Sequence, residues 1–228
     1  MKFSIFFILV VLVPSIFLPN MANALWVSIH NENTYIDTKN RIATLKQILY
    51  SVPMAFDYSH LAVSIDGFQR EPRGRMRDAQ ISLSPYVTRD SEFTKLFVHE
   101  LAHYIDLYVL VTNKNGADPS DAFYSISWQK PTVKRANEWT MDFVSGYAAA
   151  NQYEDFAESM VFYIFHNATF ADRGLRSESL RQKYLFFANS LFPRGYFQWT
   201  DFSIGRVPSY VWDTTKVAYS LQKYLYSL

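Results

Sequence analysis

The amino-acid sequence predicts an α+β fold, in which a small mixed sheet in the first half of the chain is followed by a mainly helical second half. Two short β-prone runs, Leu61–Ile65 and Asp78–Ser84, lie in the first half. In several other segments apolar residues recur every three or four positions, as they do on one face of an amphipathic helix. The α/β half is therefore expected to extend to about residue 112, and the helical half to begin at about residue 130.

The first 24 residues have the pattern of an export signal. Lys2 precedes an apolar run from Phe3 to Val13, and the small-residue triplet Ala22-Asn23-Ala24 follows. This run is too short to span about 30 Å of hydrocarbon as a helix, so we expect cleavage near Ala24 rather than a membrane anchor. The chain from Leu25 onward is predicted to form a single domain without a membrane helix, secreted to the periplasm or the extracellular medium.

The composition limits the classes of partner. The chain has 22 basic and 21 acidic side chains, and cleavage of the signal would remove one of the basic ones. Such a balance provides no overall field to attract nucleic acid or an anionic membrane, so the partner must be recognised locally. We also expect a monomeric protein. Cysteine is absent, which excludes thiolate ligands and a cysteine nucleophile. The many Tyr and Phe residues predict a core packed with aromatic rings.

Each predicted helix begins near a residue that can cap it. The expected helices are Thr38 to Tyr50, Asp90 or Ser91 to about Tyr108, Asn151 to about Phe165, Ser177 to Leu191, and a tail from about Asp213 to Tyr226. Two segments between the elements are predicted to be irregular. Gly67–Asp78, rich in arginine from Arg70 to Arg77, is expected to be a solvated loop, with contact to an anion or an acidic substrate as the alternative. Asn113–Gln129 contains Asn-Gly and Asp-Pro pairs and is expected to be a loop or a set of short turns.

The most informative motif is His99-Glu100-Leu101-Ala102-His103, within the helix expected after Ser91. Positions i and i+4 of a helix share a face, so both imidazoles can bind one metal ion while Glu100 points toward a water molecule in its open position. This spacing is typical of zinc hydrolases. We therefore predict one zinc ion, with His99 and His103 as two of its ligands.

A catalytic zinc ion takes three protein ligands, so a third has to be found. Val109 stands where the longer metzincin pattern has its third histidine, which excludes that pattern. Asp106 shares the face of His99 and His103, but its short side chain on the same helix would struggle to close the site. We expect Asp106 to accept the outer N–H of a ligand histidine, with a ligand role or a solvent-facing or capping role as alternatives.

Two further acids lie on one stripe of the helix that Asn151 opens, and acids that face inward need a cation. Glu154 is predicted as the third zinc ligand, and Glu158 as an outer hydrogen-bond partner of a ligand histidine. The alternative is that Asn151 and Glu154 form a helix capping box, which would explain Glu154 but not Glu158.

Taken together, Val98–Asp106, Ser145–Tyr147 and Glu154–Glu158 resemble the gluzincin metallopeptidases related to the catalytic domain of anthrax lethal factor and to the clostridial Pro-Pro endopeptidases. The resemblance covers roughly Leu61 to Asn167 and implies a zincin-like fold. For the site it implies zinc ligands at His99, His103 and Glu154, and Glu100 as the general base.

The same resemblance implies two further features. Tyr147 would stabilise the transition state, and an extended substrate would lie along an edge strand, for which Asp78–Ser84 is in the expected place. The expected function is a secreted zinc-dependent endopeptidase. The alternatives are a non-catalytic binding module of the same shape, which would be expected to have lost one of the zinc-site residues, and a zinc hydrolase of a non-peptide bond.

Overall fold

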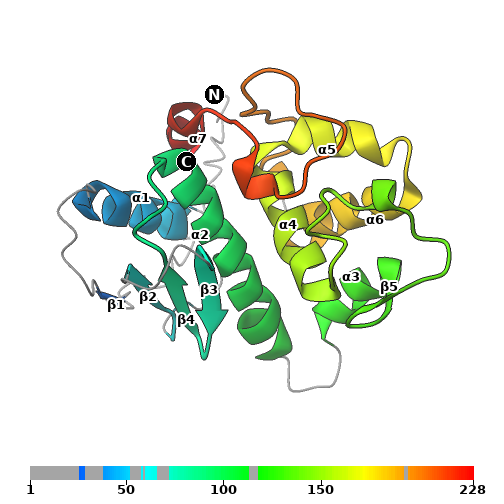
Figure 1. Ribbon diagram of the computed structural model, residues 1–228, viewed down its shortest axis with the longest axis horizontal. Coiled ribbons are helices and arrows are strands. Elements are labelled where there is room, and N and C mark those ends of the chain that lie inside the picture. Colours follow the sequence, from blue (N-terminus) through cyan, green and yellow to red (C-terminus); the bar gives the residue numbers. More distant parts are fainter. Residues whose placement is uncertain are drawn as a thin grey trace, which may run out of the picture.

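The computed structural model describes residues 26–28, 38–51, 58, 60–65, 72–112, 118–192 and 195–228. The predicted export signal lies outside these residues. None of the described helices is both long and apolar enough to cross a bilayer. Figure 1 shows a part that contains the sheet and a helical part, with the long helices α2 and α4 side by side where the two meet.

The first part contains a four-stranded mixed sheet in the order β1-β2-β4-β3. Its strands are β1 (Trp26–Ser28), β2 (Ala62–Ile65), β3 (Gly74–Arg77) and β4 (Gln80–Leu83). The pairs β1–β2 and β2–β4 are parallel, whereas β3 and β4 are antiparallel. Helix α2 (Asp90–Tyr104) packs against β3 and β4, and α1 (Thr38–Ser51) packs against α2. The predicted α+β class with a small mixed sheet is confirmed.

The prediction that Asp78–Ser84 forms the edge strand is wrong. Strand β4 lies between β2 and β3, so the edge that follows it is β3. Asp78 and Ala79 have φ angles of 51° and 59° and reverse the chain between the two strands, as the two central residues of a tight hairpin do. The solvated-loop prediction also fails for Gly74–Arg77, because β4 supplies a hydrogen-bonding partner for that backbone.

The second part is mainly helical, as predicted. After α2 the chain continues as a π-helical segment η1 (Ile105–Val109) and a 3-10 turn η2 (Leu110–Thr112). The remaining elements are α3 (Pro119–Ser127), β5 (Trp128–Lys130), β6 (Val133–Lys134), η3 (Thr140–Asp142), α4 (Gln152–Phe165), α5 (Asn167–Gly174), α6 (Glu178–Phe186), η4 (Phe187–Leu191), η6 (Thr214–Lys216) and α7 (Leu221–Ser227).

Some helix boundaries differ from the predicted ones. Asn113–Gln129 is not a run of turns, since Pro119–Ser127 is helical and the Asp118 side chain caps it by accepting the Ser120 N–H at 2.8 Å. Arg89, without a side-chain cap, precedes α2, and Asp90 instead pairs with Arg41 at 2.8 Å. In the tail, only η6 and α7 are helical, and α5 had not been predicted.

Aromatic rings hold the helical part together, as the composition predicted. Four phenylalanine rings form a cluster with centroids 5.1 to 6.0 Å apart. They are Phe123 on α3, Phe156 on α4, Phe186 at the end of α6 and Phe187 at the start of η4. Edge-to-face ring pairs of this kind add stability beyond their buried area. The cluster fixes α4, which supplies half of the candidate site described below.

A buried ion pair lies beside this cluster. Lys183 Nζ is 2.7 Å from Asp155 Oδ2, and both side chains are fully buried. Trp128 Nε1 donates to the same carboxylate at 2.9 Å, and the ammonium lies 4.0 Å from the centre of the Phe143 ring. Burial raises the pKa of Asp155, and the charge of Lys183 opposes that rise. The pair therefore links α4 and α6 to Trp128 of β5 and to Phe143, which follows η3.

Replacing Lys183 with methionine should destabilise the protein by about 3–5 kcal/mol, because the Asp155 carboxylate would stay buried without its counter-charge. The pKa of Asp155 would rise further, so the loss should be larger at pH 8 than at pH 5, where the folded protein can bind the proton. Urea unfolding of both proteins at pH 5 and pH 8 measures this change in the free energy of unfolding. Arg181→Met, on the exposed face of the same helix, is the control and should change little. An equally small effect of Lys183→Met would contradict this account.

Candidate metal centre

Helix α2 carries the His99-Glu100-Leu101-Ala102-His103 motif where the sequence predicted it. Phe93, Phe97 and Leu101 are buried on this helix and fix its rotation against its neighbours. His99 and His103 consequently lie on one face, and their ring centroids are 4.9 Å apart in an edge-to-face arrangement. This face is turned toward α4, with which α2 makes the most extensive contact between any two described elements.

Helix α4 brings Glu154 to the two histidines. Asn151 caps this helix by accepting the N–H groups of Tyr153 and Glu154, each at 3.0 Å. Glu154 Oε2 lies 3.1 Å from His99 Nε2 and 3.5 Å from His103 Nε2, so its carboxylate faces the imidazoles rather than the backbone of Asn151. The ligand atoms of the three residues all lie within 4.8 Å of one another, close enough to hold one metal ion.

The charges around His99 favour a cation at this point. Burial alone would lower the pKa of His99, but hydrogen bonds to Glu154 and Glu158 and the charge of Glu100 outweigh it and raise the pKa well above the usual value. For the acidic Glu154, burial alone would instead raise the pKa. Hydrogen bonds from His103 and His99 outweigh this effect and hold the pKa of Glu154 well below the usual range. The carboxylates of Glu100, Glu154 and Glu158 thus favour a positive charge beside His99.

Glu158 lies behind His99, one helical turn after Glu154. Its Oε1 is 3.1 Å from His99 Nδ1, and its side chain is fully buried. The Oε2 atom accepts the Ser145 hydroxyl at 2.6 Å and the Thr214 N–H at 2.8 Å. A carboxylate in this position accepts the Nδ1 proton of the imidazole, so Nε2 is the ring nitrogen that could bind a metal ion.

Glu100 is buried beside the edge strand. The backbone N–H of Met76, in β3, donates to its carboxylate, and burial raises the pKa of Glu100 against the lowering effect of His99 and His103. Gly74 of the same strand is packed so closely that a Cβ atom there would lie 2.5 Å from Glu100 Oε1. Strand β3 therefore fixes the position of this carboxylate.

Gly74→Ala is accordingly expected to displace the Glu100 carboxylate while leaving His99, His103 and Glu154 in place. Metal content should remain that of the unmodified protein, and any metal-dependent turnover should fall by at least about tenfold, since small misplacements of a reacting group are costly. Metal analysis and kinetics on one preparation measure both quantities. Parallel loss of metal and turnover would show that the glycine serves the metal-binding residues instead.

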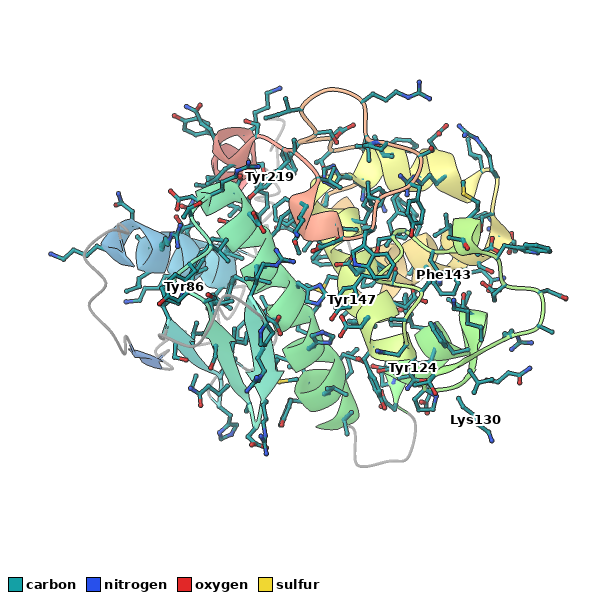
Figure 2. All side chains as sticks on the ribbon, viewed as in Figure 1. Tyr86, Tyr124, Lys130, Phe143, Tyr147 and Tyr219 are labelled. Atoms are coloured by element: carbon teal, nitrogen blue, oxygen red, sulfur yellow. The ribbon has the colours of Figure 1, made fainter. Side chains whose placement is uncertain are left out.

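Tyr147 lies between α2 and α4 (Figure 2). Its ring is stacked at 6.0 Å from that of His99. Burial and the neighbouring Glu154, to which it is hydrogen-bonded, raise the pKa of its hydroxyl, so this group stays protonated and can donate a hydrogen bond. The backbone N–H of Tyr147 donates to Trp212 O at 2.7 Å, which fixes the loop before α4 to the C-terminal segment.

Asp106 does not belong to the group that can hold the ion. It is fully buried, which excludes the solvent-facing alternative. Tyr124 donates to its Oδ2 at 2.5 Å, whereas Oδ1 has no hydrogen-bond partner in the described part of the chain. Burial raises the pKa of Asp106 to about 6. Asp106 Oδ1 is thus a buried acceptor atom on η1, the segment that continues the helix of His103.

A cavity of about 280 Å³ opens beside Glu100, and its lining includes His99, Tyr147, Gly74 and Trp212. The sequence did not predict the wall of this cavity that contains Arg73 and Asp213. Arg73 forms ion pairs with Asp213 and, at 2.5 Å, with Glu92. No local pattern marks these partners, because Arg73 and Asp213 are far apart in the sequence.

No protein-family model, curated protein or solved structure matches this chain. The residues of the site provide two imidazoles and a carboxylate around one point, a second carboxylate beside a cavity, and a protonated phenol close to both.

Proposed function

We propose that the protein is a zinc-dependent endopeptidase of the gluzincin type. The observation that carries the proposal is the convergence of His99, His103 and Glu154, from two separate helices, with Glu100 beside them at the cavity. Two imidazoles and two carboxylates gathered in a largely buried place are costly unless they bind a cation. The zincin-like fold implied by the sequence motifs is part of this proposal.

The donor set suits zinc. Two imidazoles and one carboxylate are ligands of catalytic zinc sites, which keep a fourth position open. Glu158 behind His99 supports the choice, because carboxylates commonly orient zinc-binding imidazoles from outside. We propose the same outer role for Asp106 toward His103, which would give the free Oδ1 atom a partner. Zinc bound here would supply Lewis acidity, which lowers the pKa of a water molecule and polarises a substrate carbonyl.

The residues of the chain would then move the protons. Glu100 accepts a proton from the attacking water on its carboxylate and returns it to the leaving amine. Its raised pKa suits this task, because a base whose pKa is closer to neutrality can also serve as an acid. The Tyr147 hydroxyl donates a hydrogen bond to the oxyanion that develops on the substrate carbonyl.

We propose that the substrate lies along β3 rather than along Asp78–Ser84. Strand β3 pairs only with β4 in the described sheet and passes directly over Glu100. A polypeptide added to its free side would gain main-chain hydrogen bonds, and the neighbouring cavity would accept one of its side chains. Export of the chain and a monomeric state remain part of the proposal.

The test is cleavage of a diverse peptide library by the purified chain, with and without a chelator. The proposal expects peptide cleavage that a chelator abolishes and added zinc restores. Binding of a partner without cleavage and without a need for metal would favour a non-catalytic binding module. Chelator-sensitive hydrolysis of esters or amides other than peptides would identify a different zinc hydrolase.

A further inference from the structure

Two more cavities adjoin the one beside Glu100, and all three share one lining residue, Lys216. The second has a volume of about 520 Å³ and the third about 510 Å³. Both are lined by Ile204, Val217 and Ala218, and the second also by Trp212, which lines the cavity beside Glu100 as well. We call the second and third cavities together the C-terminal groove. The groove is a continuation of the candidate active site.

The free charges of the groove all have one sign. Its carboxylates are Glu92 and Asp213, and both form ion pairs with Arg73. Its cations are Arg89, Arg206 and Lys216, and none of them makes an ion pair within the described part of the chain. A chain with nearly equal numbers of basic and acidic side chains has therefore gathered three unpaired cations around a groove whose second cavity is lined mainly by apolar residues and whose third has a mixed lining.

We propose that the C-terminal groove binds the part of a polypeptide substrate that extends away from the scissile bond, and that it selects acidic side chains next to apolar ones. The inference rests on the proposed peptidase function. In the second cavity, Arg206 and Lys216 lie beside apolar walls, and unpaired cations in such a place complement carboxylates attached to an apolar segment. They also accelerate association. A folded-protein surface or a bilayer would contact the rims of the cavities but would not fill them.

Arg206 and Lys216 are the residues whose charge is to be reversed, since Lys216 lines both the groove and the cavity beside Glu100, whereas Arg206 lines only the groove. Exposed charge pairs are individually weak, so Lys216→Glu should lower kcat/KM for an acidic peptide by about threefold or more, and the double variant with Arg206→Glu by about tenfold. For a peptide with basic flanks, the double variant should instead have a higher kcat/KM than the unmodified protein. Raising the salt concentration should reduce the preference of the unmodified enzyme.

The control is Lys130→Glu, which makes the same charge reversal on β5. Figure 2 shows Lys130 at the opposite end of the molecule from Tyr219, a residue that lines the groove. This variant should keep the full preference for acidic peptides. Three peptide sets with one common cleavable sequence and acidic, amide or basic flanks provide the comparison for all variants.

A binding measurement separates this inference from the peptidase proposal. Fluorescence anisotropy of the same labelled peptides on the Glu100→Gln protein should show tighter binding of the acidic set, lost in Lys216→Glu. Equal affinity for all three sets would overturn the inference, even if cleavage were normal. Absence of any cleavage would instead contradict the peptidase proposal. The anisotropy measurement would then decide alone whether the groove prefers acidic peptides. Lys216-dependent binding to phosphatidylserine vesicles, without any preference among peptides, would assign the groove to a membrane surface and overturn the inference.

Discussion

Glu154→Ala should abolish both metal binding and turnover. Glu154 Oε2 lies within 3.5 Å of the Nε2 atoms of both His99 and His103, so it is the group that closes the candidate site from the second helix. Without it two imidazoles on one helix remain, and a zinc site with two protein ligands is weak. Zinc affinity should fall by more than the roughly 10- to 100-fold seen when an outer partner is removed.

The measurement is zinc content after dialysis, together with peptide turnover of the same preparation. Glu178→Ala, which removes an exposed acid from α6, is the matched control and should keep both properties. A Glu154→Ala protein that retained one zinc ion per chain would show that another residue is the third ligand. Asp106, buried on the helix of His103, would then be the next residue to replace.

Glu100→Gln should differ from Glu154→Ala in one respect: zinc should be retained, although turnover is lost. Glutamine has the shape of glutamate and can still accept the Met76 N–H, so β3 and the metal-binding residues should stay in place. It cannot accept a proton from water, and general-base catalysis contributes about 10²- to 10⁴-fold to such reactions. We expect kcat to fall by about that factor while KM changes little.

Steady-state kinetics and zinc analysis decide this prediction. Turnover of Glu100→Gln within about tenfold of the unmodified enzyme would mean that Glu100 is not the base, since loss of a true base costs more. Glu158 could not replace it readily, because Glu158 is fully buried behind His99 and already holds the Ser145 hydroxyl and the Thr214 N–H.

The sequence allowed the group of His99, His103 and Glu154, which could hold a metal ion, to be predicted because its signals are local. The spacing of His99 and His103 fixes their common face once the segment is helical, and the capping residue Asn151 fixes where the helix of Glu154 begins. Pairing of the two helices follows from their buried apolar faces. Only the contact between the helix of Glu154 and the helix of the two histidines is long-range. Two acids on the inward face of the second helix indicated that contact.

Features that depend on distant partners could not be predicted in the same way. Gly74–Arg77 has little intrinsic strand preference, and it forms β3 because β4 and a tight reversal at Asp78 and Ala79 supply its pairing. The wall formed by Trp212 and Asp213 depends on hydrogen bonds to Tyr147 and an ion pair to Arg73, far away in the sequence. By contrast, α3 carried a local signal that was missed, an Asp cap followed by Pro at the first helical position.

The central claim is that His99, His103 and Glu154 hold one zinc ion, and anomalous X-ray scattering at the zinc edge from crystals of the zinc-loaded protein tests it most directly. We expect one anomalous peak per chain, about 2.0–2.2 Å from Nε2 of both histidines and from a carboxylate oxygen of Glu154. No peak at this point, or a peak bound by other side chains, would contradict the claim.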